Sequence, residues 1–179
     1  SSPPRRSWPR EPARRRDPAR LRVRRMQGRD LAAVAALDAA ALVVNHGFVP
    51  LISAARVDRW FARRYWAGRL HRPDWPTFVA DGGGQLLGAL SVDLNRARNR
   101  HMPVRRWIYL HSLFVLPAAR RRGVARALIR HAMRWAQRRG VGGAQLGMAA
   151  TNRSARSLYE SFGFRVQEVT MARRLPQLR

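Results

Sequence analysis

An apolar stretch, Trp107–Leu116, constrains this chain most, because it ends at Pro117 and an amphipathic helical pattern follows it. Apolar residues recur three and four apart from about Arg121 to Arg139, and Gly140 stands where a helix would stop. A buried strand that turns directly into a helix leaves the first amides of that helix without intrahelical acceptors. These amides and the helix dipole favour an anion at the turn.

The two sides of this predicted helix differ sharply in character. Small residues at Gly123 and Ala125 would let a pyrophosphate approach the backbone of the first turn. Arg recurs every fourth residue from Arg122 to Arg138, and like charges at that spacing cost about 0.2–0.5 kcal/mol per pair. A bound polyphosphate would reverse this cost at the first turn. We interpret the rest of the Arg row as a solvated face.

Other periodic segments surround this unit. In chain order we expect a strand near Leu21–Met26, a helix capped by Asp30 and ending near Leu42, a loop over Val43–Ser53, a helix near Ala54–Ala67, strands over Thr77–Ala80 and Gln85–Asp93, the strand and helix above, a strand over Ala144–Ala149, a helix over Asn152–Phe162 and a last strand over Phe164–Ala172. This order predicts an α/β domain with a mixed sheet over residues 21–179.

The charge of the chain is extreme, with 36 basic against 10 acidic residues and a net charge of +26. Every basic residue is Arg, which fits codon preference and also fits a surface for polyanions. Residues 1–20 are rich in Arg and Pro and poor in apolar residues, so we expect a disordered arm. Its function is either none, the reading we favour, or a weak contact with nucleic acid or another polyanion.

Composition also excludes several classes of chemistry. The chain has no Cys, which excludes disulfides, thiolate metal sites and a cysteine nucleophile, and we expect no metal cofactor. No uninterrupted apolar run approaches the roughly 18 residues of a membrane span, and the first residues lack the apolar core of a signal peptide. We therefore expect a soluble, cytoplasmic protein without membrane contact.

The pattern Val115-x-Pro117-x-x-Arg120-x-x-Gly123-x-Ala125 resembles the acetyl-CoA motif of the GNAT superfamily of N-acetyltransferases. The resemblance implies a GNAT-like fold, a mixed and mostly antiparallel central sheet with helices on both faces. It also implies that Leu113, Phe114 and Val115 lie along the pantetheine arm of acetyl-CoA. By the same resemblance the pyrophosphate is held at Arg120, Arg121, Arg122, Gly123, Val124, Ala125 and Arg126.

A second segment, Asn152-x-x-Ala155-x-x-Leu158-Tyr159 with Phe162-Gly163-Phe164 behind it, resembles the later GNAT motif and follows at the expected place. Asn152 stands where a helix begins and suits an N-cap, and the resemblance also implies a bond to pantetheine. Ala155 keeps that helix face shallow. The resemblance implies that Tyr159 protonates the departing CoA thiolate, and the alternative is a core aromatic residue.

A base must take the proton of the acceptor amine. The resemblance aligns His111 with the carboxylate that many family members carry on the long strand, and His titrates near neutrality. Strand alternation predicts that His111 shares a face with Tyr109 and Leu113. A half-buried structural His is an equal alternative. His46 is a weaker candidate, and a chain of waters would need no side-chain base.

These features together predict an N-acetyltransferase that transfers acetyl from acetyl-CoA to a primary amine by direct attack in a ternary complex. The acceptor is either a small-molecule amine or a protein N-terminus. Two alternatives remain: a nucleic-acid- or ribosome-associated basic protein on the same scaffold, and a sensor that binds acetyl-CoA without turnover. Members of the superfamily often form dimers, so a homodimer stays open.

Overall fold

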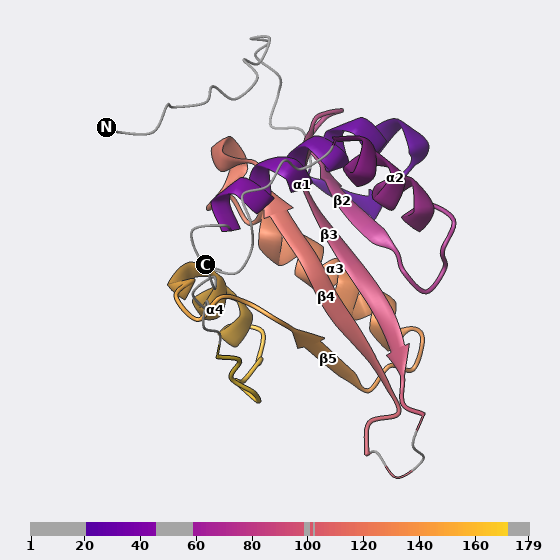
Figure 1. The fold of residues 1–179 in the computed structure, drawn as a ribbon, viewed down its shortest axis with the longest axis vertical. Coiled ribbons are helices and arrows are strands. Elements are labelled where there is room, and N and C mark those ends of the chain that lie inside the picture. The colour runs from indigo at the N-terminus through magenta and orange to yellow at the C-terminus, as the bar shows by residue number, and fades with distance from the viewer. Residues whose placement is uncertain (1–20, 46–58, 99–100, 102, 172–179) are drawn as a thin grey trace, which may run out of the picture.

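The computed structural model describes residues 21–45, 59–98, 101 and 103–171. In this part of the chain five strands form one sheet in the order β1-β2-β3-β4-β5. Their bounds are β1 Arg22–Arg25, β2 Thr77–Asp81, β3 Leu86–Arg96, β4 Arg106–Val115 and β5 Gly143–Leu146. Neighbouring strands are antiparallel except for the parallel pair β4 and β5 (Figure 1). The predicted mixed, mostly antiparallel sheet is confirmed.

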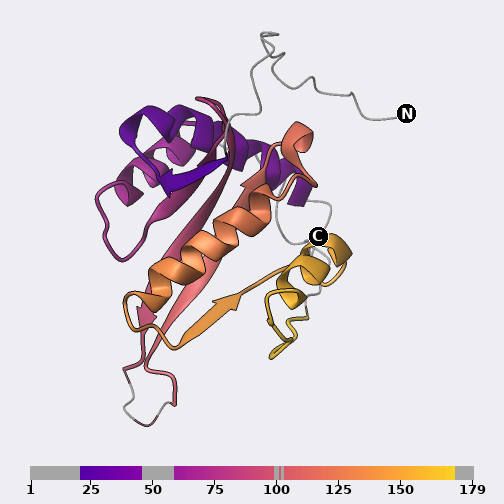
Figure 2. The same cartoon turned by 180° about the vertical axis from the view of Figure 1, so that it is seen from behind.

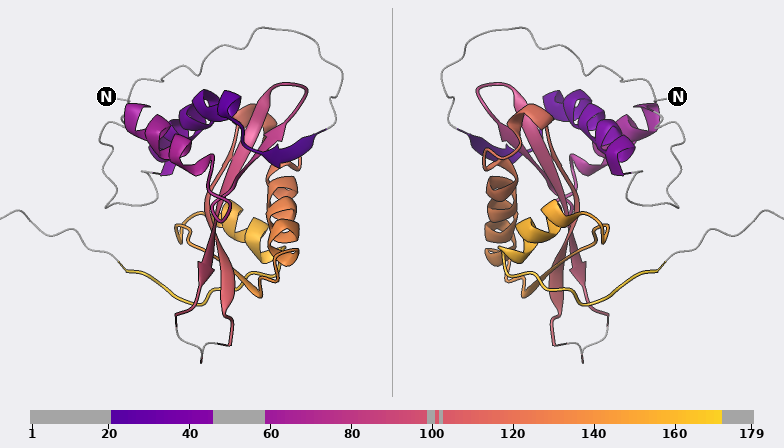
Figure 3. Two further views of the ribbon diagram at one scale, coloured as in Figure 1. Left: turned by 90° about the vertical axis from the view of Figure 1, so that its right-hand side faces the viewer. Right: turned by 90° about the vertical axis from the view of Figure 1, so that its left-hand side faces the viewer.

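Helices cover both faces of the sheet. One face carries α1, Leu31–Asn45, and α2, Arg59–Arg69, whereas the other carries α3, Val124–Gln137, and α4, Arg153–Glu160 (Figures 2 and 3). Side chains alternate between two cores, so Leu90 packs toward α3 and its neighbour Ala89 packs toward α1. No helix in the described residues is long and apolar enough to cross a membrane.

The α3 helix has the two faces that its sequence predicts. Leu128, Ile129 and Ala132 are completely buried, and the Arg row from Arg122 to Arg138 is exposed. The helix begins at Val124, three residues later than predicted. The delay arises because a 3₁₀ turn, Pro117–Ala119, follows β4 and a second turn separates it from the helix.

Two expectations at the first helix need correction. The helix continues to Asn45, so residues 43–45 are helical and not loop. Asp30 does not cap it: Asp30 ends a 3₁₀ turn, Gly28–Asp30, and its carboxylate accepts the backbone N–H of Gln27 at 2.8 Å and two hydrogen bonds from Arg24. The predicted arm over residues 1–20, His46, the remaining loop and residues 54–58 lie outside the described residues.

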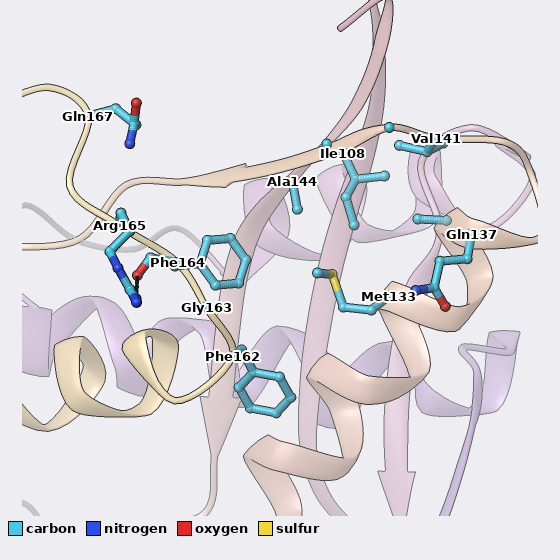
Figure 4. Close-up of a pocket in the computed structure, with 13 residues that line it drawn as sticks. Ile108, Met133, Gln137, Val141, Ala144, Phe162, Gly163, Phe164, Arg165 and Gln167 are labelled. Atoms are coloured by element: carbon cyan, nitrogen blue, oxygen red, sulfur yellow. Dashed lines mark hydrogen bonds between the residues drawn. The ribbon is translucent and has the colours of Figure 1, made fainter.

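The predicted last strand is wrong over residues 164–171, which pair with no strand of the sheet. The backbone N–H of Phe164 donates to the Tyr159 carbonyl at 3.2 Å and turns the chain back onto α4. Phe164 then points into a pocket of about 490 Å³ that Ile108 and Met133 also line (Figure 4). The following apolar side chains stay in solvent, with Met171 92% exposed, so their spacing does not give a strand.

Candidate functional site

A β-bulge interrupts β4 where the sequence placed the candidate base. Leu90 and Val92 of β3 are two residues apart, but their partners on β4, Leu113 and Leu110, are three apart. His111 and Ser112 therefore face a single residue of β3. The extra residue reverses the alternation of side chains beyond it, so Leu113 packs with the α3-side core, and the prediction that Leu113 shares a face with His111 is wrong. The prediction that His111 shares a face with Tyr109 is confirmed, because their ring centroids are 4.8 Å apart.

The candidate base has an acidic partner on the neighbouring strand. His111 Nε2 lies 2.8 Å from Asp93 Oδ2, with 43% of the His111 side chain exposed. This contact assigns Nε2 as the hydrogen-bond donor to the carboxylate and leaves Nδ1 as the proton-accepting nitrogen. The arrangement is that of a histidine whose tautomer and ring orientation are set by a carboxylate.

Arg69 fixes Asp93 from the opposite side. Its Nη2 donates to Asp93 Oδ1 at 2.5 Å and to the Val92 carbonyl oxygen at 2.9 Å, and Arg69 is only 4% exposed. Tyr65 accepts a further hydrogen bond from Nη1 at 3.3 Å. A buried guanidinium bonded to both carboxylate and backbone has little freedom. Asp93 is thus held between a buried cation and a partly exposed imidazole.

The parallel strands β4 and β5 part immediately beside this pair. Their last register pair is Leu110 with Leu146, where β5 ends, whereas β4 continues to Val115. The diverging path of β5 is visible in Figure 1. Residues 111–115 therefore lack a β5 partner for the backbone groups on that edge. Leu113, Phe114 and Val115, the predicted pantetheine-binding residues, all lie in this stretch.

The turn before α3 exposes backbone amides at the other end of the same stretch. Gly123 is the N-cap residue with φ of 81°, and a Cβ placed on it would meet nothing within 4 Å. The N–H of Ala127 makes the first helical bond, to the Gly123 carbonyl at 3.0 Å, so the amides of residues 124–126 precede it. Arg120, Arg121, Arg122 and Arg126 are exposed around this turn, and Arg120 Nε donates to the Val115 carbonyl at 3.3 Å.

The second motif lies on α4. Asn152 caps this helix, because its Oδ1 accepts the backbone N–H of Ala155 at 3.0 Å, which confirms the N-cap prediction. Tyr159 packs against the α3-side core, with its ring centroid 5.8 Å from that of Phe164. Burial raises the pKa of Tyr159 to about 12 and keeps the phenol protonated. Tyr159 and His111 thus lie on opposite faces of the sheet.

Comparison with known proteins decides the family. A model of the acetyltransferase (GNAT) family matches residues 45–164. The chain belongs to the acetyltransferase (GNAT) family. A 111-residue stretch is also 32% identical to an uncharacterised N-acetyltransferase of Methanocaldococcus jannaschii, which covers 62% of this chain and 48% of that protein. The chain therefore matches about half the length of this relative.

Solved structures share the fold. A transcriptional regulator from Bacillus halodurans superposes with a TM-score of 0.71 at 17% identity over 87% of this chain and all of that one. The aminoglycoside N-acetyltransferase AAC(6')-Iy, solved with CoA, superposes with a TM-score of 0.68 at 19% identity over 91% of this chain and 99% of that one. A predicted acetyltransferase from Clostridium acetobutylicum, solved with acetyl-CoA, gives a TM-score of 0.69 at 14% identity over 87% of this chain and 96% of that one. At these identities the likeness shows the fold.

Sequence reasoning missed Asp93 and Arg69. The family resemblance directs attention to a carboxylate on the same strand as His111. Asp93 stands instead on the neighbouring strand β3, two residues after the fully buried Ser91. The sequence did contain a signal for Asp93, because this acidic residue interrupts the mainly apolar strand segment Leu90–Leu94. Acidic residues within strands are uncommon unless they have a partner, so this position indicates a cationic or imidazole neighbour.

Proposed function

We propose that this chain is an N-acetyltransferase that moves an acetyl group from acetyl-CoA to a primary amine while both are bound. The observation that carries the proposal is the parting of β4 and β5 at Leu110 and Leu146. One end of the parted stretch leads to the first turn of α3, where the amides of residues 124–126 precede the first helical hydrogen bond, and the other end carries the pair of His111 and Asp93. The stretch therefore joins a turn that suits an anion to a candidate proton acceptor.

The residues at this place fit acetyl-CoA, which supplies an activated acetyl thioester. The open space at Gly123 and the amides of residues 124–126 suit its pyrophosphate. No β5 residue pairs with residues 113–115, so their backbone groups on that edge are available to its pantetheine arm, apart from the Val115 carbonyl, which accepts from Arg120 Nε. The exposed Arg120, Arg121 and Arg122 add positive charge near the phosphates.

Two side chains would handle protons. His111 Nδ1 accepts the proton that the amine loses, while Asp93 stabilises the resulting imidazolium and holds its orientation. Tyr159, protonated because its pKa is about 12, donates a proton to the departing CoA thiolate. Their placement on opposite faces suits an acceptor that arrives from the α1–α2 side and a donor that runs toward α3 and α4. The N–C bond forms as the C–S bond breaks, without an acyl-cysteine.

Calorimetric titration with acetyl-CoA and a thiol-release assay against a panel of primary amines test this function. We expect micromolar acetyl-CoA binding and release of CoA thiol that depends on the amine. Binding without turnover on any amine would make the protein a sensor, and absence of acetyl-CoA binding would remove the proposal altogether.

The proton acceptor is tested separately by substitution. His111→Ala should reduce kcat by roughly 10²–10⁴-fold, the usual contribution of a general base, and should change the pH profile of kcat. His101→Ala is a matched control, since His101 is an exposed histidine of the β3–β4 connection. An unchanged pH profile in His111→Ala would reject the base assignment.

A further inference from the structure

A separate pocket opens beside the pair of His111 and Asp93. It has a volume of about 340 Å³ and is lined by six residues from β3, β4 and β5: Asp93, Asn95, Trp107, Tyr109, His111 and Gln145. Asn95 pairs with Trp107 and Asp93 with Tyr109 in the sheet register, so the four form two rows along one face. This face is the one that α2 covers, because Arg69 reaches Asp93 from that helix.

Unlike the Arg-rich rest of the molecule, this pocket is lined by one acidic residue and, among the described residues, by no Arg. The chain has 36 basic residues, all Arg, yet none of those in the described part lines the pocket, where Asp93 is the only permanently charged group. Arg69 touches Asp93 but is 4% exposed, and its Nη1 and Nη2 atoms donate to Tyr65, the Val92 carbonyl and Asp93. A carboxylate on the acceptor would approach the like charge of Asp93 here without an Arg on the described wall to pair with it.

Two aromatic residues, Trp107 and Tyr109, line the pocket together with two side-chain amides, those of Asn95 and Gln145. The Tyr109 hydroxyl lies against the backbone just after β5, since a Cβ on Gly147 would lie 2.8 Å from it. Aromatic faces bind apolar rings and also attract ammonium groups. His111, at one end of the pocket, directly follows Leu110, which forms the last β4–β5 pair with Leu146.

We infer that this pocket holds the acceptor of the proposed reaction, and that the acceptor is a primary amine on an aromatic or apolar body without a carboxylate or phosphate. The inference rests on the proposed function and names its substrate class. The ammonium enters toward Asp93 and loses its first proton to water, His111 then takes the proton that the neutral amine loses as the N–C bond forms, and the body packs against Trp107 and Tyr109.

Tyramine and tyrosine test this inference, because they share the ring and the amine and differ by one carboxylate. We expect kcat/KM for tyramine to exceed that for tyrosine by roughly 100-fold, the scale set by an unpaired carboxylate. Asp93→Asn should shrink this ratio at least tenfold, whatever it does to absolute activity. Arg96→Gln, a control at the exposed end of β3, should leave the ratio unchanged.

The outcomes separate the acceptor class from the proposed function. Trp107→Leu should raise KM for tyramine more than for propylamine, which has no ring. Equal or better use of tyrosine would overturn the inference and leave the acetyltransferase standing. The inference also fails if acetyl-CoA binds but neither aromatic amine reacts. Absence of acetyl-CoA binding would instead remove the proposed function itself.

Discussion

Gly88 of β3 runs so close to Phe114 of β4 that a Cβ atom on Gly88 would lie 2.5 Å from the Phe114 carbonyl oxygen. Its other near neighbours are the Cα and Cγ2 atoms of Val115, both at 3.3 Å. Glycine is required here by the approach of a neighbouring backbone, and its φ is not in the left-handed region. The part of β4 that we assign to pantetheine is therefore positioned by a missing side chain on the next strand.

Gly88→Ala should displace β4 and lower the free energy of unfolding by about 1–3 kcal/mol, the usual cost of overpacking. Acetyl-CoA affinity should fall with it, because the displaced residues are those proposed to hold the cofactor. Urea denaturation and calorimetry measure the two effects. Gly68→Ala is the control, because Gly68 lies in α2 and a Cβ at that position would meet nothing within 4 Å. This change should slightly raise the free energy of unfolding.

Gly123 gives a second prediction, at the proposed pyrophosphate turn. Gly123→Glu places an anion where phosphates would bind and should abolish measurable acetyl-CoA binding. Because φ is 81°, any side chain also costs about 1 kcal/mol of stability. Gly140→Ala isolates that backbone cost, since Gly140 has φ of 64° at the far end of α3 and equal free space. Acetyl-CoA binding by Gly123→Glu with unchanged affinity would contradict the assigned site.

Local patterns predicted the elements that depend on local physics. The α3 helix was predictable because its buried residues, such as Leu128 and Ile129, follow the 3.6-residue period of a helix. The N-cap role of Asn152 was predictable because a capping side chain bonds only to its own helix. The bulge at His111 was not predictable, since it depends on which β3 residues stand opposite. Asp93 was missed for the same reason. The sequence therefore predicted candidate residues that lie on one strand, such as His111. The pair of His111 and Asp93 spans two strands and could be found only from the register of β3 against β4.

Tyr159→Phe should lower kcat by roughly 10²–10⁴-fold and leave acetyl-CoA affinity nearly unchanged, because the ring that packs near Phe164 is kept. Burial raises the pKa of Tyr159 to about 12, so its proton is present throughout the neutral and mildly alkaline range. The substitution should therefore lower the whole pH profile of kcat without removing a limb. Full activity in Tyr159→Phe would rule out the acid role.

The ion pair between Arg24 and Asp30 gives a prediction about acid stability. Arg24 donates to both oxygens of Asp30, at 2.6 and 2.9 Å, and Asp30 is 7% exposed. These hydrogen bonds lower the pKa of Asp30 below its unfolded value of about 3.9. For a carboxyl group with a lowered folded pKa, the stabilisation is complete above the unfolded pKa and is lost as pH falls through the folded one.

Asp30→Asn should therefore lower the free energy of unfolding at pH 7 by about 1–3 kcal/mol, the scale of a hydrogen bond to a charged group. The difference from the unsubstituted protein should narrow as the pH is lowered below about 4, where Asp30 in the unfolded chain becomes protonated. Urea titrations over a series of pH values measure this. Asp74→Asn, at an exposed pair 3.7 Å from Arg96, should change stability by less than about 1 kcal/mol at every pH. An Asp30→Asn deficit that stays constant into acid would assign the effect to packing and not to charge.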